Sequence, residues 1–577
     1  MKRKALLFCS LALVTSLVSC GEDTTSSALS SSSTTESSSV STSTVSENVI
    51  TNEDLEKAQT TYIDENGETQ DLNRDSLYRN SGNPHLNPLG NQHVLVVPFS
   101  FEKNASDSRD TVVADDAMLE KIKTTFTADQ ETMESLGGTI SVSDFYTKSS
   151  YGKANFEATV LDTWVQYDGT AKEFESKYSS VGAGVGASIE ITSWYKAEYN
   201  KPSHGALGED AKEWSYFDSD KDGYIDLMWI VYAYPYTQGN TNFWWAYVTY
   251  TSNNANVTNP TVKTLGWAST LFMTERNNGY DSHTFIHETG HTFGLDDYYD
   301  YANRWKPMGG IDYMDQNLGD HSAYSKFSLG WTSPWVLSEE DLAGGKEAEI
   351  TLRPLTTTGD CLLLASPNYN NTAFDEYFML ELMAPIGIAK DDYLKGYQSQ
   401  VGYSKPGIRM THVDARVFGG GVSHDSYYTD ANLLGQKGTE LRVGNTYGGR
   451  IGWNYDSDFW PKEDGTNKMP MPHFSIIESY VPEDNWTNSP TYSASNDSLF
   501  VSGNRFRSTS GDWCSTYMPS GTNLWNKAVT TTGWTNSNTK TYTTDEECDF
   551  SYNFRVTSIE EDEEYGYIAK VVVSLAE

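Results

Sequence analysis

The sequence has few cysteines, little positive charge and no long apolar segment beyond its first 20 residues. Three cysteines follow residue 20, at Cys361, Cys514 and Cys548, and this odd number of widely separated thiols indicates no disulfide framework. Lys and Arg total 41 against 79 Asp and Glu, so the formal net charge is -38. Nucleic acid is therefore not an expected partner, because phosphate binding needs a basic surface.

The N-terminus has the pattern of a bacterial export signal. Three basic residues at positions 2–4 precede an apolar run over residues 5–18, which is short for a membrane span. The run ends in Leu-Val-Ser-Cys-Gly at residues 17–21, which resembles a lipobox, where the cysteine is lipidated and the preceding bond is cleaved. We therefore predict a signal peptide over residues 1–20 and a lipid anchor on Cys20, which would hold the protein at the cell surface, on the outer face of the bacterial membrane.

The remaining chain divides into four segments of different composition. Residues 21–48 are mostly Ser and Thr, cannot bury enough apolar surface to fold, and are predicted to be a tether. Residues 49–91 are a polar leader and a possible propeptide. The rest exceeds what one core usually organises, so we predict an α/β catalytic domain over residues 92–340 and an all-β sandwich over residues 341–577.

Hydrophobic patterns support this division. In the first domain strand and helix candidates alternate, at residues 93–99, 117–126, 225–233 and 284–293. Beyond residue 340 short strand candidates dominate, at residues 377–382, 408–413, 474–477 and 568–575.

The segment His287-Glu288-Thr289-Gly290-His291 has the spacing of a zinc-hydrolase helix. Residues four apart lie one turn apart on the same face, so His287 and His291 can bind one ion while Glu288 lies beside its water. Bound zinc lowers the pKa of that water toward about 7, and Glu288 would take its proton and pass it to the leaving amine. The pattern predicts peptide-bond hydrolysis without a covalent intermediate.

The third ligand must come from outside this segment. His283 lies on the same face, but three histidines on successive turns span about 12 Å, too far for one ion with bonds near 2 Å. Gly294 can adopt a positive φ and turn the chain back, which returns Asp297 to the metal. We therefore predict Asp297 as the third ligand, with the adjacent Asp296 as the alternative.

The extended pattern HExxHxxGxxD resembles the metzincin arrangement, with Asp297 in place of the usual third histidine. Residues 291–300 are most similar to the immune inhibitor A family of secreted bacterial metallopeptidases. The resemblance runs from about residue 92 to the C-terminus and includes residues 141–153, 314–331, 376–381 and 407–414. It implies a metzincin-like zinc endopeptidase with His287, His291 and Asp297 as ligands and Glu288 as the general base.

The resemblance also implies which residues surround the metal. Met314 falls where the family has its Met-turn, an apolar floor under the metal, and Met308 is the competing choice. Some metzincins place a tyrosine two residues after that methionine, where this chain has Gln316. Candidate transition-state donors are therefore His321 and Tyr299, each with a structural role as the alternative.

Residues 218–226, Asp-Ser-Asp-Lys-Asp-Gly-Tyr-Ile-Asp, place carboxylates at alternate positions as an EF-hand-like calcium loop does. The predicted ligands are the carboxylates of Asp218, Asp220, Asp222 and Asp226 and the carbonyl of Tyr224. The glutamate expected at position twelve is absent, because Trp229 stands there. The alternative is a polar turn that binds no ion.

We predict a lipid-anchored, monomeric zinc endopeptidase with calcium as a second metal and proteins or peptides as substrates. Two other functions fit parts of the sequence. One is a non-catalytic adhesin or carbohydrate-binding lipoprotein with a peptidase-like domain, against which the intact His287, Glu288, His291 and Asp297 argue. The other is a zinc amidase acting on cell-wall peptides, which the family resemblance disfavours.

Overall fold

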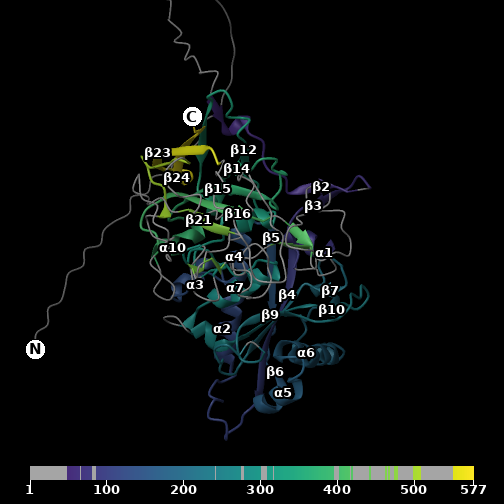
Figure 1. Ribbon diagram of the computed structural model, residues 1–577. Coiled ribbons are helices and arrows are strands. Elements are labelled where there is room, and N and C mark those ends of the chain that lie inside the picture. The colour runs from purple at the N-terminus through teal and green to yellow at the C-terminus, as the bar shows by residue number, and fades with distance from the viewer. Residues whose placement is uncertain are drawn as a thin grey trace, which may run out of the picture. The chain divides into compact units, whose positions relative to one another are not determined.

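The structure is a computed structural model that describes residues 49–64, 66–80, 86–240, 242–274, 279–299, 308–315, 318–394, 402–415, 417–419, 441–443, 462–463, 466–467, 474–477, 498–508 and 550–576. The predicted signal peptide, tether and lipidation site Cys20 lie outside these residues, as do Gln316, Cys514 and Cys548. Residues 1–47 and 48–577 form separate units, and every element below belongs to the second (Figure 1). None of the helices in these ranges is long and apolar enough to cross a membrane.

A six-stranded sheet organises the first part of this unit, in the order β5-β4-β8-β11-β9 with β6 also paired to β4. Its strands are β4 (Gly90–Glu102), β5 (Ala154–Val160), β6 (Val165–Thr170), β8 (Leu227–Tyr232), β9 (Tyr247–Tyr250) and β11 (Thr264–Ser269). All pairs are parallel except β9 with β11. The strands predicted at residues 93–99 and 225–233 are confirmed as β4 and as β8, which the short β7 (Tyr224–Ile225) precedes.

Both faces of this sheet are covered, which explains why its central strands are apolar throughout. Alternate residues enter different cores: Val96 and Trp229 pack on one face, and Val97 and Ile230 on the other. The first face also contacts α2 (Asp116–Thr127), α4 (Val142–Ser149) and α7 (His283–Thr292), and the second contacts α5 (Ala171–Tyr178) and α6 (Ala183–Tyr199) (Figure 1). The helices predicted at residues 117–126 and 284–293 are thus confirmed as α2 and α7, and the mixed α/β character is confirmed.

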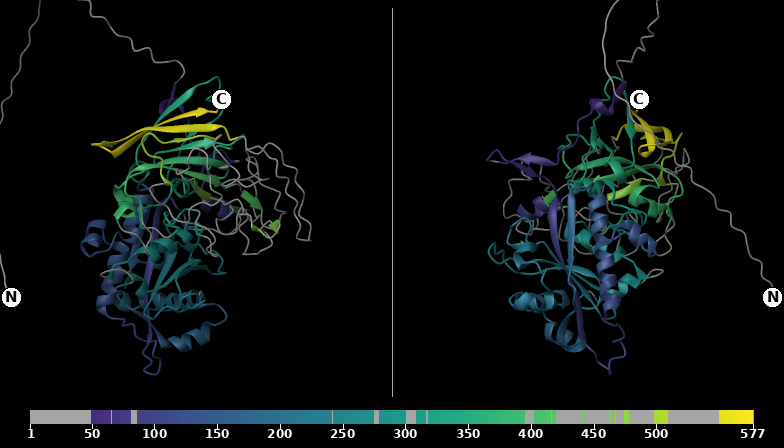
Figure 2. Two further views of the ribbon diagram at one scale, coloured as in Figure 1. Left: turned by 60° about the vertical axis from the view of Figure 1, so that its left-hand side comes forward. Right: turned by 180° about the vertical axis from the view of Figure 1, so that it is seen from behind.

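Two five-stranded sheets enclose a further core, which includes Ile350, Phe378 and Val571. One contains β1 (Val49–Thr51), β13 (Glu347–Leu352), β24 (Gly566–Leu575), β23 (Tyr552–Asp562) and β22 (Arg505–Phe506). The other contains β12 (Trp335–Leu337), β14 (Cys361–Ala365), β15 (Glu376–Met383), β16 (Gly407–Asp414) and β21 (Phe474–Ile477). The four strands predicted beyond residue 340 are confirmed as β15, β16, β21 and β24. Strands β23 and β24 lie at the opposite end of the unit from α5 and α6 (Figure 2).

Short elements complete the described chain. The leader contributes β1, the hairpin of β2 (Thr61–Ile63) and β3 (Thr69–Asp71), and α1 (Arg74–Asn80). The others are α3 (Gln130–Ser135), β10 (Thr261–Val262), α8 (Ala323–Ser328), α9 (Leu355–Thr358), α10 (Asp391–Leu394), β17 (Val417–Gly419), β18 (Leu441–Val443), β19 (Lys462–Glu463) and β20 (Thr466–Asn467). The sheets of the predicted C-terminal domain therefore also contain β1 and β12, from earlier in the chain.

Candidate metal centre

Helix α7 carries the two histidines, and Gly294 turns the chain back toward them. Gly294 has φ +87°, a conformation that favours glycine, and its amide donates to the His291 carbonyl at 3.0 Å. The Leu295 amide then donates to the Gly290 carbonyl at 3.2 Å. This reversal brings Asp297, ten residues after His287, to the histidine face of the helix.

The side chains of His287, His291 and Asp297 converge as a set of ligands would. Asp297 Oδ1 lies 2.9 Å from His287 Nε2 and 3.3 Å from His291 Nε2. Ligand atoms on a tetrahedral zinc ion with bonds near 2 Å stand about 3.3 Å apart, so these separations suit one small ion. Among the described residues at this helix, these three form the group whose ligand atoms all lie within 4.8 Å of one another.

Backbone carbonyls orient both imidazoles. His287 Nδ1 lies 2.9 Å from the Tyr313 carbonyl, and His291 Nδ1 lies 2.8 Å from the Leu295 carbonyl. A carbonyl only accepts, so Nδ1 carries the hydrogen and Nε2 is the atom left to bind a metal. The carbonyls thus direct Nε2 of both rings toward Asp297, where a bound metal would replace the hydrogen on Nε2.

The centre concentrates opposite charges in a buried space. Burial acts to raise the pKa of Asp297, but His291 and His287 outweigh it and hold that pKa well below its usual range. Burial disfavours a charged His291 ring, yet Asp297 more than compensates and raises the His291 pKa to about 10. Asp297 is therefore anionic across the physiological range and supplies the charge that a divalent cation needs.

Glu288 lies beside the ligands on the same helix. Its pKa is raised, mainly by burial, while the two ligand histidines act to lower it. The next residue anchors the helix to the central sheet, because the buried Thr289 hydroxyl accepts a hydrogen bond from Trp229 Nε1 on β8 at 3.0 Å. Gly266 on β11 leaves the space that the Trp229 ring occupies.

The alternative ligands point elsewhere. The His283 ring centroid lies 6.1 Å from that of His287 and 5.4 Å from that of Tyr313, and His283 is outside the ligand group. Asp296 Oδ2 lies 2.8 Å from Arg74 Nη2 of the leader, and Asp296 is outside the ligand group. The geometry thus distinguishes Asp297 from both of its rivals.

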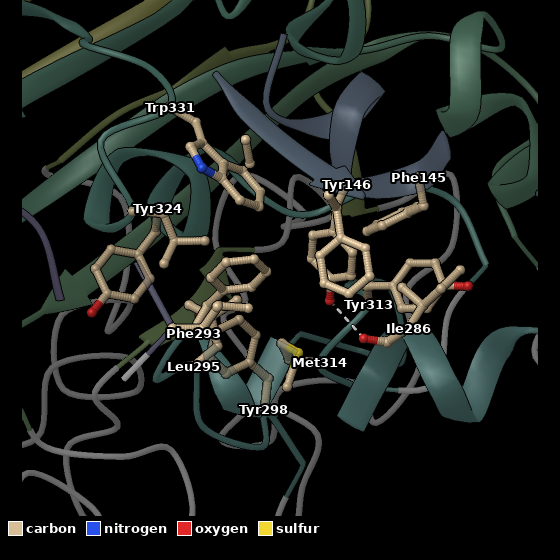
Figure 3. Packing of buried hydrophobic residues seen from close by; sticks show 14 of the residues in the cluster. Phe145, Tyr146, Ile286, Phe293, Leu295, Tyr298, Tyr313, Met314, Tyr324 and Trp331 are labelled. Carbon is tan, nitrogen blue, oxygen red and sulfur yellow. Dashed lines mark hydrogen bonds between the residues drawn. The ribbon is translucent and has the colours of Figure 1, made fainter. Parts of the chain in front are cut away.

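Met314 packs beneath the ligand helix (Figure 3). A methyl group on Gly290 would collide with the Met314 sulfur, so the absence of a side chain there makes room for it. The Met314 carbonyl accepts from the Tyr298 amide at 2.8 Å, which joins this turn to the segment carrying Asp297. Met308 is buried in the same core, and Met314 is the methionine that contacts Gly290 of the helix.

The two candidate donors occupy different environments. Tyr299 stacks beside His287, at 6.2 Å between ring centroids, and its hydroxyl donates to the Asp297 carboxylate. His321 is 1% exposed and packs among the rings of Phe145 and Trp331, away from the ligand group. The structure therefore brings Tyr299 to the centre but not His321.

A buried polar network supports the Met314 turn, and sequence reasoning did not find it. Asp312 accepts hydrogen bonds from the Met314 and Ser322 amides, each at 2.9 Å. Arg409 on β16 donates to the Ile311 carbonyl at 2.9 Å and to Glu381 at 2.7 Å, and both charged groups are 1% exposed. No local motif marks such residues, since their partners lie far away in sequence.

The predicted calcium loop closes around three of its carboxylates. Ligand oxygens of Asp218, Asp220 and Asp222 lie within 4.8 Å of one another. One Asp218 oxygen is buried with no hydrogen-bond partner among the described residues, and the residue is only 7% exposed. Burial and the charges of Asp222 and Asp220 raise the Asp218 pKa. A cation here would satisfy the orphaned oxygen and remove this repulsion.

Asp226 stands apart from the other three carboxylates. Its oxygens accept from the Ser219 amide at 2.9 Å and from the His93 amide at 2.7 Å. Burial raises the pKa of Asp226 to about 7. Its carboxylate therefore ties the loop to β4, while Tyr224 donates its amide to Asp222 at 2.9 Å.

No protein-family model matches the chain, and no curated protein is significantly similar to it in sequence.

Proposed function

We propose that the protein is a zinc-dependent endopeptidase, held at the cell surface by lipid on Cys20, with a metzincin-like catalytic domain and a β-sandwich. The observation that carries the proposal is the convergence of His287 Nε2, His291 Nε2 and Asp297 Oδ1, with both Nδ1 atoms held by carbonyls. Three protein ligands are the number that a catalytic zinc site uses, because the fourth position is left for water and substrate.

When bound, zinc would act as a Lewis acid and activate a water near neutral pH. The chain's own contribution to the chemistry comes from Glu288, next to the ligand His287. Because burial raises the pKa of Glu288, this carboxylate is suited to accept a proton and then release it to the leaving amine. Asp297 balances the charge of the centre, and Tyr299 orients Asp297 through its hydroxyl.

Removing the metal is expected to abolish proteolysis. A chelator that prefers transition metals, such as 1,10-phenanthroline, should stop casein cleavage, and added zinc should restore it, with calcium kept constant throughout. Cleavage that persists in protein shown to be metal-free would contradict the proposal. Zinc-loaded protein that cuts cell-wall peptides but not casein would indicate an amidase, and one that cuts neither would indicate an adhesin.

We propose further that residues 218–226 bind calcium, on the strength of the buried, unpartnered Asp218 oxygen. Calcium at 100 times its dissociation constant should then raise the free energy of unfolding by about 2.7 kcal/mol. The melting temperature should rise accordingly. Asp220→Ala should remove this gain, because Asp220 is an exposed member of the ligand group. The exposed Asp210→Ala is the matched control, and an unchanged calcium response in Asp220→Ala would contradict the site.

A further inference from the structure

The leader is built into the folded unit at several points. Strand β1 pairs in parallel with β13, from Val49 opposite Glu347 to Thr51 opposite Glu349. The Ala58 amide donates to the Pro334 carbonyl at 2.9 Å. Three leader leucines, at positions 72, 77 and 86, are at most 4% exposed and belong to the core that also contains α7. Removing the leader would therefore expose part of that core to water.

Arg74 connects the leader to the metal centre. It begins helix α1, where Asn73 and Ser76 cap the first turn by exchanging hydrogen bonds between side chains and amides. Its side chain is 0% exposed, and Nη2 lies 2.8 Å from Asp296 Oδ2. Nη1 donates to the Tyr324 hydroxyl on α8 at 3.2 Å. A single buried guanidinium thus bridges α8 and the segment that carries the third ligand.

Asp296 and Asp297 contact different partners although they are adjacent in the chain. Asp296 faces Arg74, and Asp297 faces His287 and His291. Without Arg74 the Asp296 side chain, which is 29% exposed, would lose its ion-pair partner, and the charges of the two adjacent carboxylates would repel each other. Holding Asp296 back therefore directs Asp297 toward the histidines.

We infer that residues 49–91 are a permanent part of the active protein and that Arg74 is a positioning residue for the metal ligand Asp297. The inference rests on the proposed zinc site. An inhibitory propeptide would have to leave for activity to appear. This leader instead supports the ligand loop, and its Leu86 amide donates to the carbonyl of Thr292, the last residue of α7, at 2.9 Å.

Zinc affinity of the full chain tests the positioning role. Arg74→Met and Asp296→Asn should each raise the zinc dissociation constant about 10–100-fold, the range typical of removing a group that orients a metal ligand. Both substitutions break the same ion pair. The double variant should therefore bind zinc no more weakly than the single variant with the lower zinc affinity. Arg555→Met, which breaks the exposed pair with Glu347, should leave zinc binding unchanged.

The outcomes separate this inference from the proposed function. Wild-type protein that fails to bind zinc would contradict both. Wild-type affinity in Arg74→Met together with a lowered melting temperature of the metal-free protein would show a merely structural arginine. If Arg74→Met does not fold, Asp296→Asn tests the same inference. Wild-type zinc affinity in Asp296→Asn would then overturn it. Mass spectrometry of the active cell-surface form should find residues 49–91, and an active form beginning after residue 91 would overturn their permanence.

Discussion

Replacing Glu288 with glutamine should lower casein cleavage about 10²–10⁴-fold while zinc remains bound. Glutamine has nearly the same shape but cannot accept the proton that general base catalysis requires. Glu288 is not in the ligand group, so the substitution leaves His287, His291 and Asp297 in place. Its raised pKa means that burial already disfavours the charge there, and the neutral amide should not destabilise the helix.

The measurement compares kcat/KM for casein or a fluorogenic peptide with the zinc content of the same preparation. Glu131→Gln, at an exposed position of α3, is the matched control and should be fully active. Full activity of zinc-loaded Glu288→Gln would show that another group takes the proton, and loss of zinc with loss of activity would show that Glu288 is instead a ligand.

Replacing Asp297 with alanine should weaken zinc binding by more than the roughly 100-fold that loss of an outer partner produces, and abolish activity. The variant removes one of three ligands and also the only carboxylate in the ligand group. Two neutral histidines would remain, without the anion that now raises their pKa values. Protons would compete less for these rings, but the site would have one ligand fewer and no negative charge to attract the cation, so zinc binding weakens.

Competition with a chromophoric chelator measures this loss, and two variants rank the alternatives. His283→Ala should retain zinc, because His283 stacks on His287 and Tyr313 but lies outside the ligand group. Asp296→Asn should fall between His283→Ala and Asp297→Ala. A loss of zinc in His283→Ala as large as that in Asp297→Ala would mean that the third ligand is His283.

The β-rich sheets have a structural connection to the centre. Arg409, on β16, holds the Ile311 carbonyl in the turn that ends at Met314. Its partner Glu381, on β15, also accepts from the Ala323 amide at the start of α8. Buried ion pairs of this kind are costly to break, because the remaining charge has no compensation. These strands therefore hold the turn that ends at Met314 and the start of α8.

The geometry of the ligand helix and its turn follows from local sequence. The helical period places His287, Glu288 and His291 together, and a glycine at the helix end reverses the chain. Gly294 has the positive φ expected of it, and Asp297 reaches the histidines. The strands β4 and β8 could also be predicted from their apolar runs, because a strand that is covered on both faces does not alternate polar and apolar residues.

Contacts between distant segments were decided by tertiary structure alone. Arg74 and Asp296 are 222 positions apart, and nothing near either residue specifies the other. Asp226 fits the calcium pattern by spacing, yet packing of the loop against β4 gives its carboxylate to the His93 amide. A polar leader likewise looks dispensable in sequence, since three isolated leucines form no pattern until a core encloses them. The ligand helix and its turn depend on backbone dihedrals within the segment from His287 to Asp297. The partner of a buried charge such as Arg74 is determined only when distant segments have packed together.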